Sequence, residues 1–165
     1  MAAIQFPFRI GNGYDVHQLS EGRELWIGGV QVAHSKGAVA HSDGDVLIHA
    51  LCDALLGAAN LHDIGWHFPD TSEEFRGIDS KILLKKVMEF VRAAGYELGN
   101  VDAVICLQQP KLKPLIPAMQ QALAQAMQAD VRQVSVKATT TEKLGFVGRE
   151  EGIAAYAVAL LVAQL

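Results

Sequence analysis

The sequence has few of the residues on which several protein classes depend. Its 165 residues include two cysteines, Cys52 and Cys106, and the apolar neighbours of each predict reduced, buried thiols in place of a disulfide framework. Charged residues make up 19% of the chain and hydrophobic residues 50%, which excludes an intrinsically disordered protein. The formal net charge of −4 argues against a protein that binds the nucleic-acid backbone.

The sequence also lacks a long apolar run. Its longest uncharged stretch of this kind, residues 153–165, falls short of the roughly 20 residues that a membrane-spanning helix needs. Residues 1–17 lack the charged start, the apolar centre and the cleavage site of a secretion signal. We therefore expect a soluble, cytoplasmic protein that binds neither membranes nor nucleic acids, and a chain of this length most simply forms one domain.

What the sequence does contain is a mixture of strand and helix patterns. Extended segments are predicted over residues 8–19, 24–32 (a hairpin around Gly28 and Gly29), 100–108 and 133–139. Helices are predicted over residues 42–60 with Ser42 as the cap, over residues 80–95, and from Pro114 or Pro117 to about Gln128. Residues 153–165 fit a helix or a buried strand equally well. These patterns predict one α+β or α/β domain.

One candidate site begins with Asp15 and His17, which lie two residues apart on a predicted strand. Their side chains leave the same face of that strand, and a carboxylate with an imidazole suits zinc. His49 adds a third candidate ligand on a predicted helix, where it shares one stripe with Asp45 and Asp53. If His49 binds the metal, an acid of that stripe is expected to orient its other ring nitrogen. Otherwise His49 is a half-buried histidine between two solvated acids.

Three further polar clusters each allow two interpretations from the residues alone. His41 and Ser42 stand at the start of the predicted helix, where they form either an anion site or only a loop residue and a cap. Residues 137–149 hold three consecutive threonines, Glu142 and three cationic side chains, which suit phosphate and Mg²⁺ or equally a solvated turn. Asp63 suits either sugar hydroxyls or a turn.

In this order, the motifs resemble those of one enzyme family. They are RIGNGYDVH at 9–17, IGGV at 27–30, AHSDGDVLIHAL at 40–51, DALLGAA at 53–59, DIG at 63–65, FPDT at 68–71, LGNVD at 98–102, QQPK at 108–111, VKATTTEKLGF at 136–146 and GREEGI at 148–153. Over residues 9–161 the chain is similar to the 2-C-methyl-D-erythritol 2,4-cyclodiphosphate synthases of the non-mevalonate isoprenoid pathway. Residues 1–8 match nothing, so we expect an N-terminal extension followed by a synthase domain at 9–165.

The resemblance implies a fold and an assembly. It implies a single α+β domain with a mixed β-sheet and helices on one face, which would make residues 153–165 a strand. It also implies a homotrimer around a threefold axis, with active sites between subunits and an axial cavity where some relatives hold isoprenoid diphosphates. The chain departs from the family pattern at Trp66, His67 and Glu150.

The resemblance further implies a lyase that releases CMP from a cytidine diphosphate substrate. The substrate's 2-phosphate would attack its own β-phosphorus, close to Zn²⁺ on Asp15, His17 and His49 and to Mg²⁺ or Mn²⁺ on Glu142. His41 and Thr140 match residues that stabilise the transition state. The positions that match substrate contacts are Asp15, Val16, His17, His41, Ser42, Asp63, Ile64, Gly65, Phe68, Pro69, Asp70, Thr71, Ser72, Leu107, Gln108, Gln109, Pro110, Lys111, Leu112, Lys113, Thr139, Thr140, Thr141, Glu142, Phe146 and Arg149.

Two other functions are alternatives to this one. A metal-dependent phosphohydrolase would use the same ligands with water as the nucleophile, but the sequence offers no spare general base beside them. A non-catalytic trimer that binds isoprenoid diphosphates would need the axial cavity, but it would not need Glu142 together with Asp15, His17 and His49.

Overall fold

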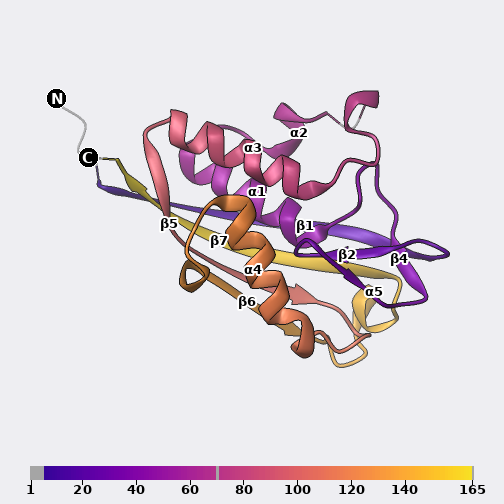
Figure 1. The fold of residues 1–165 in the computed structure, drawn as a ribbon. Coiled ribbons are helices and arrows are strands. Elements are labelled where there is room, and N and C mark those ends of the chain that lie inside the picture. The colour runs from indigo at the N-terminus through magenta and orange to yellow at the C-terminus, as the bar shows by residue number, and fades with distance from the viewer. Residues whose placement is uncertain (1–5, 70, 165) are drawn as a thin grey trace.

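The computed structural model describes residues 6–69 and 71–164, and Figure 1 shows how the elements are arranged. The strands are β1 (Phe8–Glu21), β2 (Leu25–Ile27), β3 (Val30–Val32), β4 (Lys36–Ala38), β5 (Tyr96–Cys106), β6 (Val134–Thr139) and β7 (Gly152–Ala163). The α-helices are α1 (Val46–Ala59), α2 (Ile64–His67), α3 (Ser80–Ala93), α4 (Ile116–Met127) and α5 (Gly145–Gly148). Short 3-10 turns lie at Glu73–Phe75, Lys113–Leu115 and Val131–Gln133.

One mixed sheet organises the domain, with the strand order β4-β1-β7-β5-β6, and β2 and β3 form the predicted separate hairpin. β5 and β6 are parallel, whereas the other neighbouring pairs are antiparallel. Helices α1, α3 and α4 lie on one face of the sheet (Figure 1). The expected α+β domain with a mixed sheet and helices on one face is therefore confirmed. The ambiguous C-terminal run forms the central strand β7.

Helix α1 packs directly against the backbone of β1, because glycines line the strand where the two elements meet. A Cβ atom on Gly13 would lie 2.0 Å from the carbonyl oxygen of Ala50, and one on Gly11 would lie 2.0 Å from that of Ala54. Only a residue without a side chain fits at such a distance. The close approach brings the inward face of β1 within reach of side chains on α1.

Two predictions about the helices are wrong. Asp45, not Ser42, caps α1: its Oδ1 accepts from the backbone N–H groups of Ile48 at 3.0 Å and Gly28 at 2.8 Å, and its Oδ2 from Gly29 at 2.7 Å. Asp45 is fully buried because it also ties the β2–β3 hairpin to the helix, and burial raises the pKa of its carboxyl in spite of these three donors. Ile82, which was expected to face inward from α3, is 58% exposed.

The face of the sheet opposite the helices is apolar and exposed. Alternate residues of β1 and β7 place Ile10, Tyr14, Tyr156 and Val158 there, with exposed fractions between 43% and 66%. Tyr14 and Tyr156 are direct cross-strand neighbours with ring centroids 4.7 Å apart. Exposed apolar patches on a protein surface are commonly interaction sites. Across the described part of the chain, no helix has both the length and the apolar character needed to cross a membrane.

Candidate metal centre and substrate cavity

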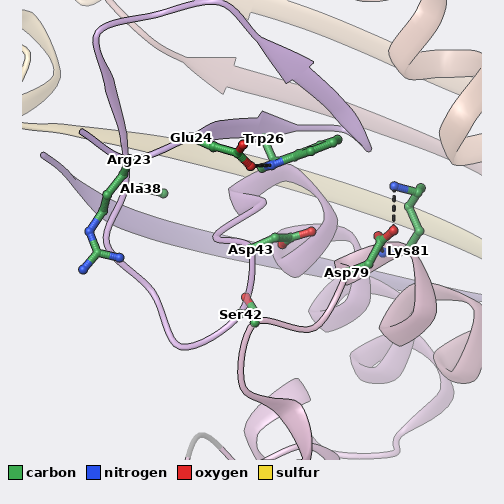
Figure 2. Close-up of a pocket in the computed structure, with 9 residues that line it drawn as sticks. Arg23, Glu24, Trp26, Ala38, Ser42, Asp43, Asp79 and Lys81 are labelled. Carbon is green, nitrogen blue, oxygen red and sulfur yellow. Dashed lines mark hydrogen bonds and ion pairs between the residues drawn. The ribbon is translucent and has the colours of Figure 1, made fainter. Parts of the chain in front are cut away.

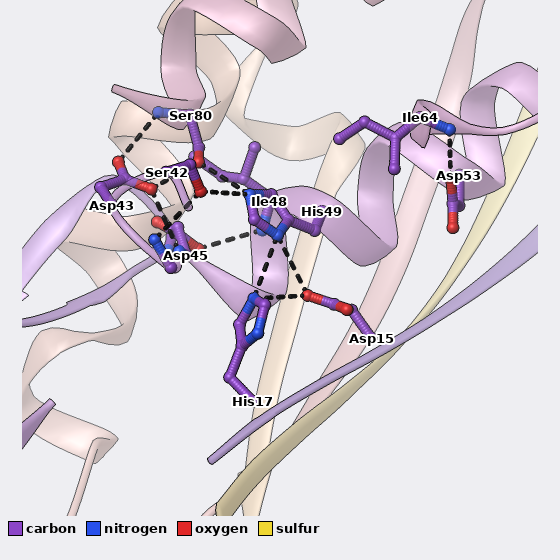
Figure 3. Close-up of polar contacts among 12 residues, drawn as sticks. Asp15, His17, Ser42, Asp43, Asp45, Ile48, His49, Asp53, Ile64 and Ser80 are labelled. Atoms are coloured by element: carbon purple, nitrogen blue, oxygen red, sulfur yellow. Dashed lines mark hydrogen bonds and ion pairs between the residues drawn. The ribbon is translucent and has the colours of Figure 1, made fainter. Parts of the chain in front are cut away.

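Three predicted ligands meet at the contact between β1 and α1. Asp15 and His17 lie on the inward face of β1, the same face as Gly11 and Gly13, and His49 projects toward them from α1 (Figure 3). The Oδ2 atom of Asp15 lies 3.0 Å from Nε2 of His17 and 3.1 Å from Nδ1 of His49. The two histidine nitrogens are 3.2 Å apart. The sequence prediction that these three residues form one group is correct.

The spacing of these atoms fits a metal ion. Metal–ligand bonds of ~2.0–2.1 Å in tetrahedral geometry place ligand atoms about 3.3 Å apart, close to the 3.0–3.2 Å found here. A carboxylate oxygen and two imidazole nitrogens at this distance repel one another unless a proton or a cation lies between them. Within residues 6–69 and 71–164, this is the one group of three or more His, Cys, Asp or Glu side chains with that placement. The geometry identifies a candidate metal site with three protein ligands.

The electrostatics of the group favour a positive charge. Burial acts to raise the pKa of Asp15, but hydrogen bonds and charge from His17 and His49 outweigh it and lower the pKa to about 2. Burial acts to lower the pKa of His49, but its hydrogen bond to Asp15 and the nearby negative charges raise that pKa above its ordinary value. Asp15 is thus held as a carboxylate, which is the form that binds a metal.

The partner of the second ring nitrogen of His49 differs from the prediction. Its Nε2 lies 3.0 Å from Oγ of Ser80 and 3.2 Å from Oγ of Ser42. Neither acid of the predicted stripe reaches it, because Asp45 caps α1 and Asp53 accepts from the backbone N–H of Ile64 at 2.8 Å. No local pattern points to Ser80, which lies 31 residues further along the chain, at the start of α3.

A cavity of about 440 Å³ opens beside the three ligands. Seven of its lining residues were predicted as site residues: His17, His41, Ser42, His49, Ile64, Gly65 and Phe68. Four were not predicted: Ala40, Phe75, Ile78 and Leu83, which come from the loops on either side and from α3. The rings of Phe68 and Phe75 pack edge to face at 5.5 Å and form an apolar wall. His41, a predicted catalytic residue, donates from Nε2 to the carbonyl oxygen of Ser72 at 3.0 Å. Ser72 lies between Phe68 and Phe75 in the sequence, so this hydrogen bond attaches His41 to the segment that forms the apolar wall.

The loop that follows α1 is organised by turn chemistry. Asp63 caps α2 by accepting from the N–H of Trp66 at 2.8 Å, and its side chain remains exposed at the edge of the loop. Asp53 holds the start of the same helix through Ile64. Val16, also predicted as a contact, lies on the outer face of β1 with 43% of its surface exposed. Asp70 lies outside the described residues.

The other predicted cluster forms a separate cavity of about 410 Å³. It lies at the carboxyl ends of the parallel strands β5 and β6 and is lined by Leu107, Pro110, Lys111, Leu112, Lys113, Ile116, Ala138, Thr139 and Thr140. Beyond it, the hydroxyl of Thr140 donates to Oε1 of the exposed Glu142 at 3.1 Å. The N–H of Lys143 donates to the Oε1 atom of Gln108 at 3.3 Å, which ties residues 139–143 to residues 107–113.

Sheet register gives the spacing of the strands that carry the two groups of residues. Val16, Ala154, Cys106 and Thr139 form one row across four neighbouring strands. Three strand spacings of ~4.8 Å separate Val16 from Thr139 by about 14 Å. Within one chain, Asp15 and His17 are therefore three strands away from Thr139. The cavity beside the metal group and the cavity beside Thr139 and Thr140 share no lining residue.

The comparisons with known proteins agree with this architecture. A family model described as the YgbB family matches residues 8–162. The chain belongs to the YgbB family. A curated YgbB relative from Porphyromonas gingivalis, "2-C-methyl-D-erythritol 2,4-cyclodiphosphate synthase", is 68% identical over 159 residues, which are 96% of this chain and 98% of that protein.

Two solved structures are similar to this YgbB chain over most of its length. A structure of 2C-methyl-D-erythritol-2,4-cyclodiphosphate synthase in a CDP-bound form is 40% identical with a TM-score of 0.85, covering 93% of this chain and 99% of that one. The bifunctional IspDF from Campylobacter jejuni is 48% identical with a TM-score of 0.92 over 96% of this chain. This chain corresponds to 43% of that longer protein.

Two residues that the resemblance placed near the substrate lie around α5 of the YgbB chain. The ring of Phe146 packs over Gly152, where a Cβ atom would be 2.9 Å from its Cδ2. Arg149 forms a two-point ion pair with Glu151, at 3.0 and 3.1 Å. Neither residue lines the two cavities described above.

Another cavity of about 410 Å³ was not predicted from the sequence (Figure 2). Ser42 lines both this cavity and the one beside the metal group, whereas Asp43 lines only this one. The Nζ atom of Lys81 lies 2.9 Å from Oδ2 of Asp79 and 5.4 Å from the centre of the Trp26 ring, so this ammonium group already has two partners. Residues 42–43 of the YgbB chain thus form a wall between these two cavities.

Proposed function

We propose that the chain converts 4-diphosphocytidyl-2-C-methyl-D-erythritol 2-phosphate to 2-C-methyl-D-erythritol 2,4-cyclodiphosphate and CMP. The observation that carries this proposal is the group of Asp15, His17 and His49, with ligand atoms 3.0–3.2 Å apart beside an open cavity, in a chain of this family. The reaction is an intramolecular phosphoryl transfer, in which the substrate's 2-phosphate attacks the β-phosphorus and CMP departs. An enzyme that catalyses this reaction is a phosphorus–oxygen lyase of the non-mevalonate isoprenoid pathway.

The residues present suit this chemistry without a general base. A phosphate nucleophile is already anionic at neutral pH, so the protein has to align the groups and neutralise charge. When bound, Zn²⁺ on Asp15, His17 and His49 and Mg²⁺ or Mn²⁺ on Glu142 supply positive charge to the phosphoryl oxygens. His41 and Thr140 donate hydrogen bonds to oxygens on which negative charge develops. For His41, such donation replaces its present bond to the carbonyl of Ser72.

We further propose that the active site forms between subunits of a homotrimer. A cation held by Glu142 and a metal held by Asp15, His17 and His49 would both supply positive charge to the same diphosphate, so the two groups would have to lie close together. Within one chain the strands that carry the two groups are about 14 Å apart at Val16 and Thr139, which favours a site completed by residues 107–113 and 139–142 of a neighbouring chain. The exposed apolar face of β1 and β7 offers the surface on which copies associate. Isoprenoid diphosphate binding near the threefold axis and a cytoplasmic location stay predictions from the sequence.

The origin of the oxygen atoms in the products tests the reaction. The substrate is incubated with the metal-loaded enzyme in ¹⁸O-labelled water, and the products are weighed. An intramolecular attack leaves both CMP and the cyclic diphosphate unlabelled. A hydrolase that attacks the β-phosphorus with water puts one solvent oxygen into the erythritol product, and that result would overturn the proposal.

A pair of variants tests the role of Glu142 in the same assay. Removal of one charge-stabilising contact commonly lowers turnover ~10²–10³-fold, and we expect a loss of this size for Glu142→Gln. Glu89→Gln is the matched control, because Glu89 is an exposed acid on α3 that pairs with Lys86 and lines neither cavity. Equal turnover of the two variants would rule out Glu142 as a ligand of the second cation.

A further inference from the structure

A buried chain of hydrogen bonds leads from His49 away from the metal site. The Nε2 atom of His49 lies 3.0 Å from Oγ of Ser80, and that Oγ lies 2.5 Å from Oδ1 of Asp43 (Figure 3). The backbone N–H of Ser80 donates to Oδ2 of the same carboxylate at 2.8 Å. Ser80 is fully buried, so water does not compete for these bonds. These hydrogen bonds connect the loop before α1, helix α1 itself and the first residue of α3.

The chemistry of the end group fixes the direction of every bond in this chain. A carboxylate accepts hydrogen bonds and has no proton to give, so the single hydroxyl proton of Ser80 points to Asp43. The Oγ of Ser80 then faces His49 with a lone pair and accepts from Nε2–H. Because Nε2 carries the proton, the lone pair of the neutral ring lies on Nδ1, the atom that faces Asp15 and His17.

Ser42 cannot fix this direction, although it also reaches Nε2. Its Oγ lies 3.2 Å from Nε2 of His49 and accepts from the N–H of Gly44 at 3.2 Å. Within residues 6–69 and 71–164 no carboxylate is hydrogen-bonded to the Ser42 hydroxyl, so Ser42 is able to donate to the ring as well as to accept from it. The group that sets the direction of the hydrogen bonds is therefore the carboxylate of Asp43, which lines the cavity shown in Figure 2.

We propose that Asp43 and Ser80 are positioning residues that hold His49 as the Nε2–H tautomer and so present Nδ1 to the metal ion. Neither residue is among the substrate or metal positions that the family resemblance implies. The metal part of this inference rests on the proposed function, and in the metal-free chain the carboxylate of Asp15, 3.1 Å from Nδ1, competes with Ser80 for the ring proton of His49. Hydrogen-bond partners of metal-bound histidines commonly contribute about 10- to 100-fold in metal affinity.

The decisive variant is Asp43→Asn, because asparagine has nearly the same shape as aspartate but carries an NH₂ donor in place of one acceptor oxygen. An asparagine that accepts from the N–H of Ser80 through its oxygen turns its NH₂ group toward Oγ. The hydroxyl of Ser80 is then free to donate to Nε2 of His49, which moves the ring proton to Nδ1 and removes the lone pair from the metal side. Asp79→Asn is the matched control. Asp79 also lies at the start of α3, where its side chain accepts from the N–H of Lys81 at 2.9 Å, but it makes no hydrogen bond to Asp43, Ser80 or His49.

Two measurements on the full-length protein test the proposal. Zinc affinity, measured by competition with a chromophoric chelator, should fall about 10- to 100-fold in Asp43→Asn and stay at the wild-type value in Asp79→Asn. Nitrogen-15 NMR of histidine-labelled, metal-free protein at about pH 9.5, where imidazoles are neutral, should show a larger share of His49 with its proton on Nε2 in the wild type than in Asp43→Asn. A role limited to fold stability would lower affinity without moving this proton.

The results that overturn the proposal are equally specific. An Asp43→Asn protein with the wild-type share of the Nε2–H tautomer would refute it, and so would an Asp43→Asn protein with wild-type zinc affinity. If Asp43→Asn fails to fold, Ser80→Ala removes the same connection, and unchanged zinc affinity there would also refute the proposal. Because no arm uses the substrate, these outcomes are independent of the oxygen-labelling test of the proposed function.

Discussion

Adding one methyl group at Gly13 should damage both the fold and the metal site, because β1 and α1 touch at this residue. A Cβ atom there would lie 2.0 Å from the carbonyl oxygen of Ala50, and contacts below 3.0 Å essentially never occur. Gly13→Ala therefore forces α1 away from β1 by at least about 1 Å, and the backbone oxygen cannot rotate aside as a side chain could. Overpacking of a core costs ~1–3 kcal/mol, occasionally more, and we expect about 3 kcal/mol here.

The same displacement acts on the metal group. His49 immediately precedes Ala50 on α1, whereas Asp15 and His17 stay on β1. Distances of 3.1 and 3.2 Å from Nδ1 of His49 would grow toward about 4 Å, beyond the about 3.3 Å that a tetrahedral metal requires. We therefore expect Gly13→Ala to lose zinc affinity as well as stability.

Urea unfolding of the metal-free protein and a zinc competition assay check both effects. Gly57→Ala is the matched control, since Gly57 lies on the same helix, is exposed, and has no atom within 4 Å of the added Cβ. This control should stabilise the protein by roughly 0.5–1 kcal/mol, because alanine is the better helix former. The reasoning is refuted if Gly13→Ala unfolds within 1 kcal/mol of the wild type, or if it binds zinc as tightly.

Three further predictions concern pH, the buried cap and the outer face. In the metal-free protein the pKa of His49 is raised, so protonated His49 stabilises the fold below pH ~6.5 and this stabilisation is lost as pH rises through the folded pKa. Zinc has to displace that proton, so the increase in Tm that zinc causes should become larger between about pH 6 and pH 8; a constant increase would contradict this. Asp45→Ala leaves three backbone N–H groups without their acceptor and should cost about 3 kcal/mol or more in urea unfolding, whereas a loss below 1 kcal/mol would show that water replaces the carboxylate. Tyr156→Glu places a charge on the exposed apolar face and should reduce the particle mass in light scattering from three chains to one, and a wild-type monomer at micromolar concentration would exclude the trimer.

Local patterns in the sequence were sufficient for much of the fold and for the metal group. The spacing of two between Asp15 and His17 places both on one face of any strand, whatever surrounds it. The apolar stripe of residues 46–59 specifies a buried helix, and the position of His49 in it follows from the helical period. These inferences hold because side-chain direction in a strand or helix depends on backbone geometry within a few residues.

Contacts between distant segments had to come from the tertiary structure. The run at 153–165 became a strand because β7 lies between β1 and β5, an environment that its own small apolar residues do not specify. Local patterns could not identify Asp45 as a buried cap, because two of its partners, Gly28 and Gly29, precede it by 17 and 16 residues. Ser80 reaches His49 only because α3 packs against α1. The distance of about 14 Å between Val16 and Thr139 follows from strand order, and strand order is set by which apolar surfaces pack together, which no local pattern in the chain encodes.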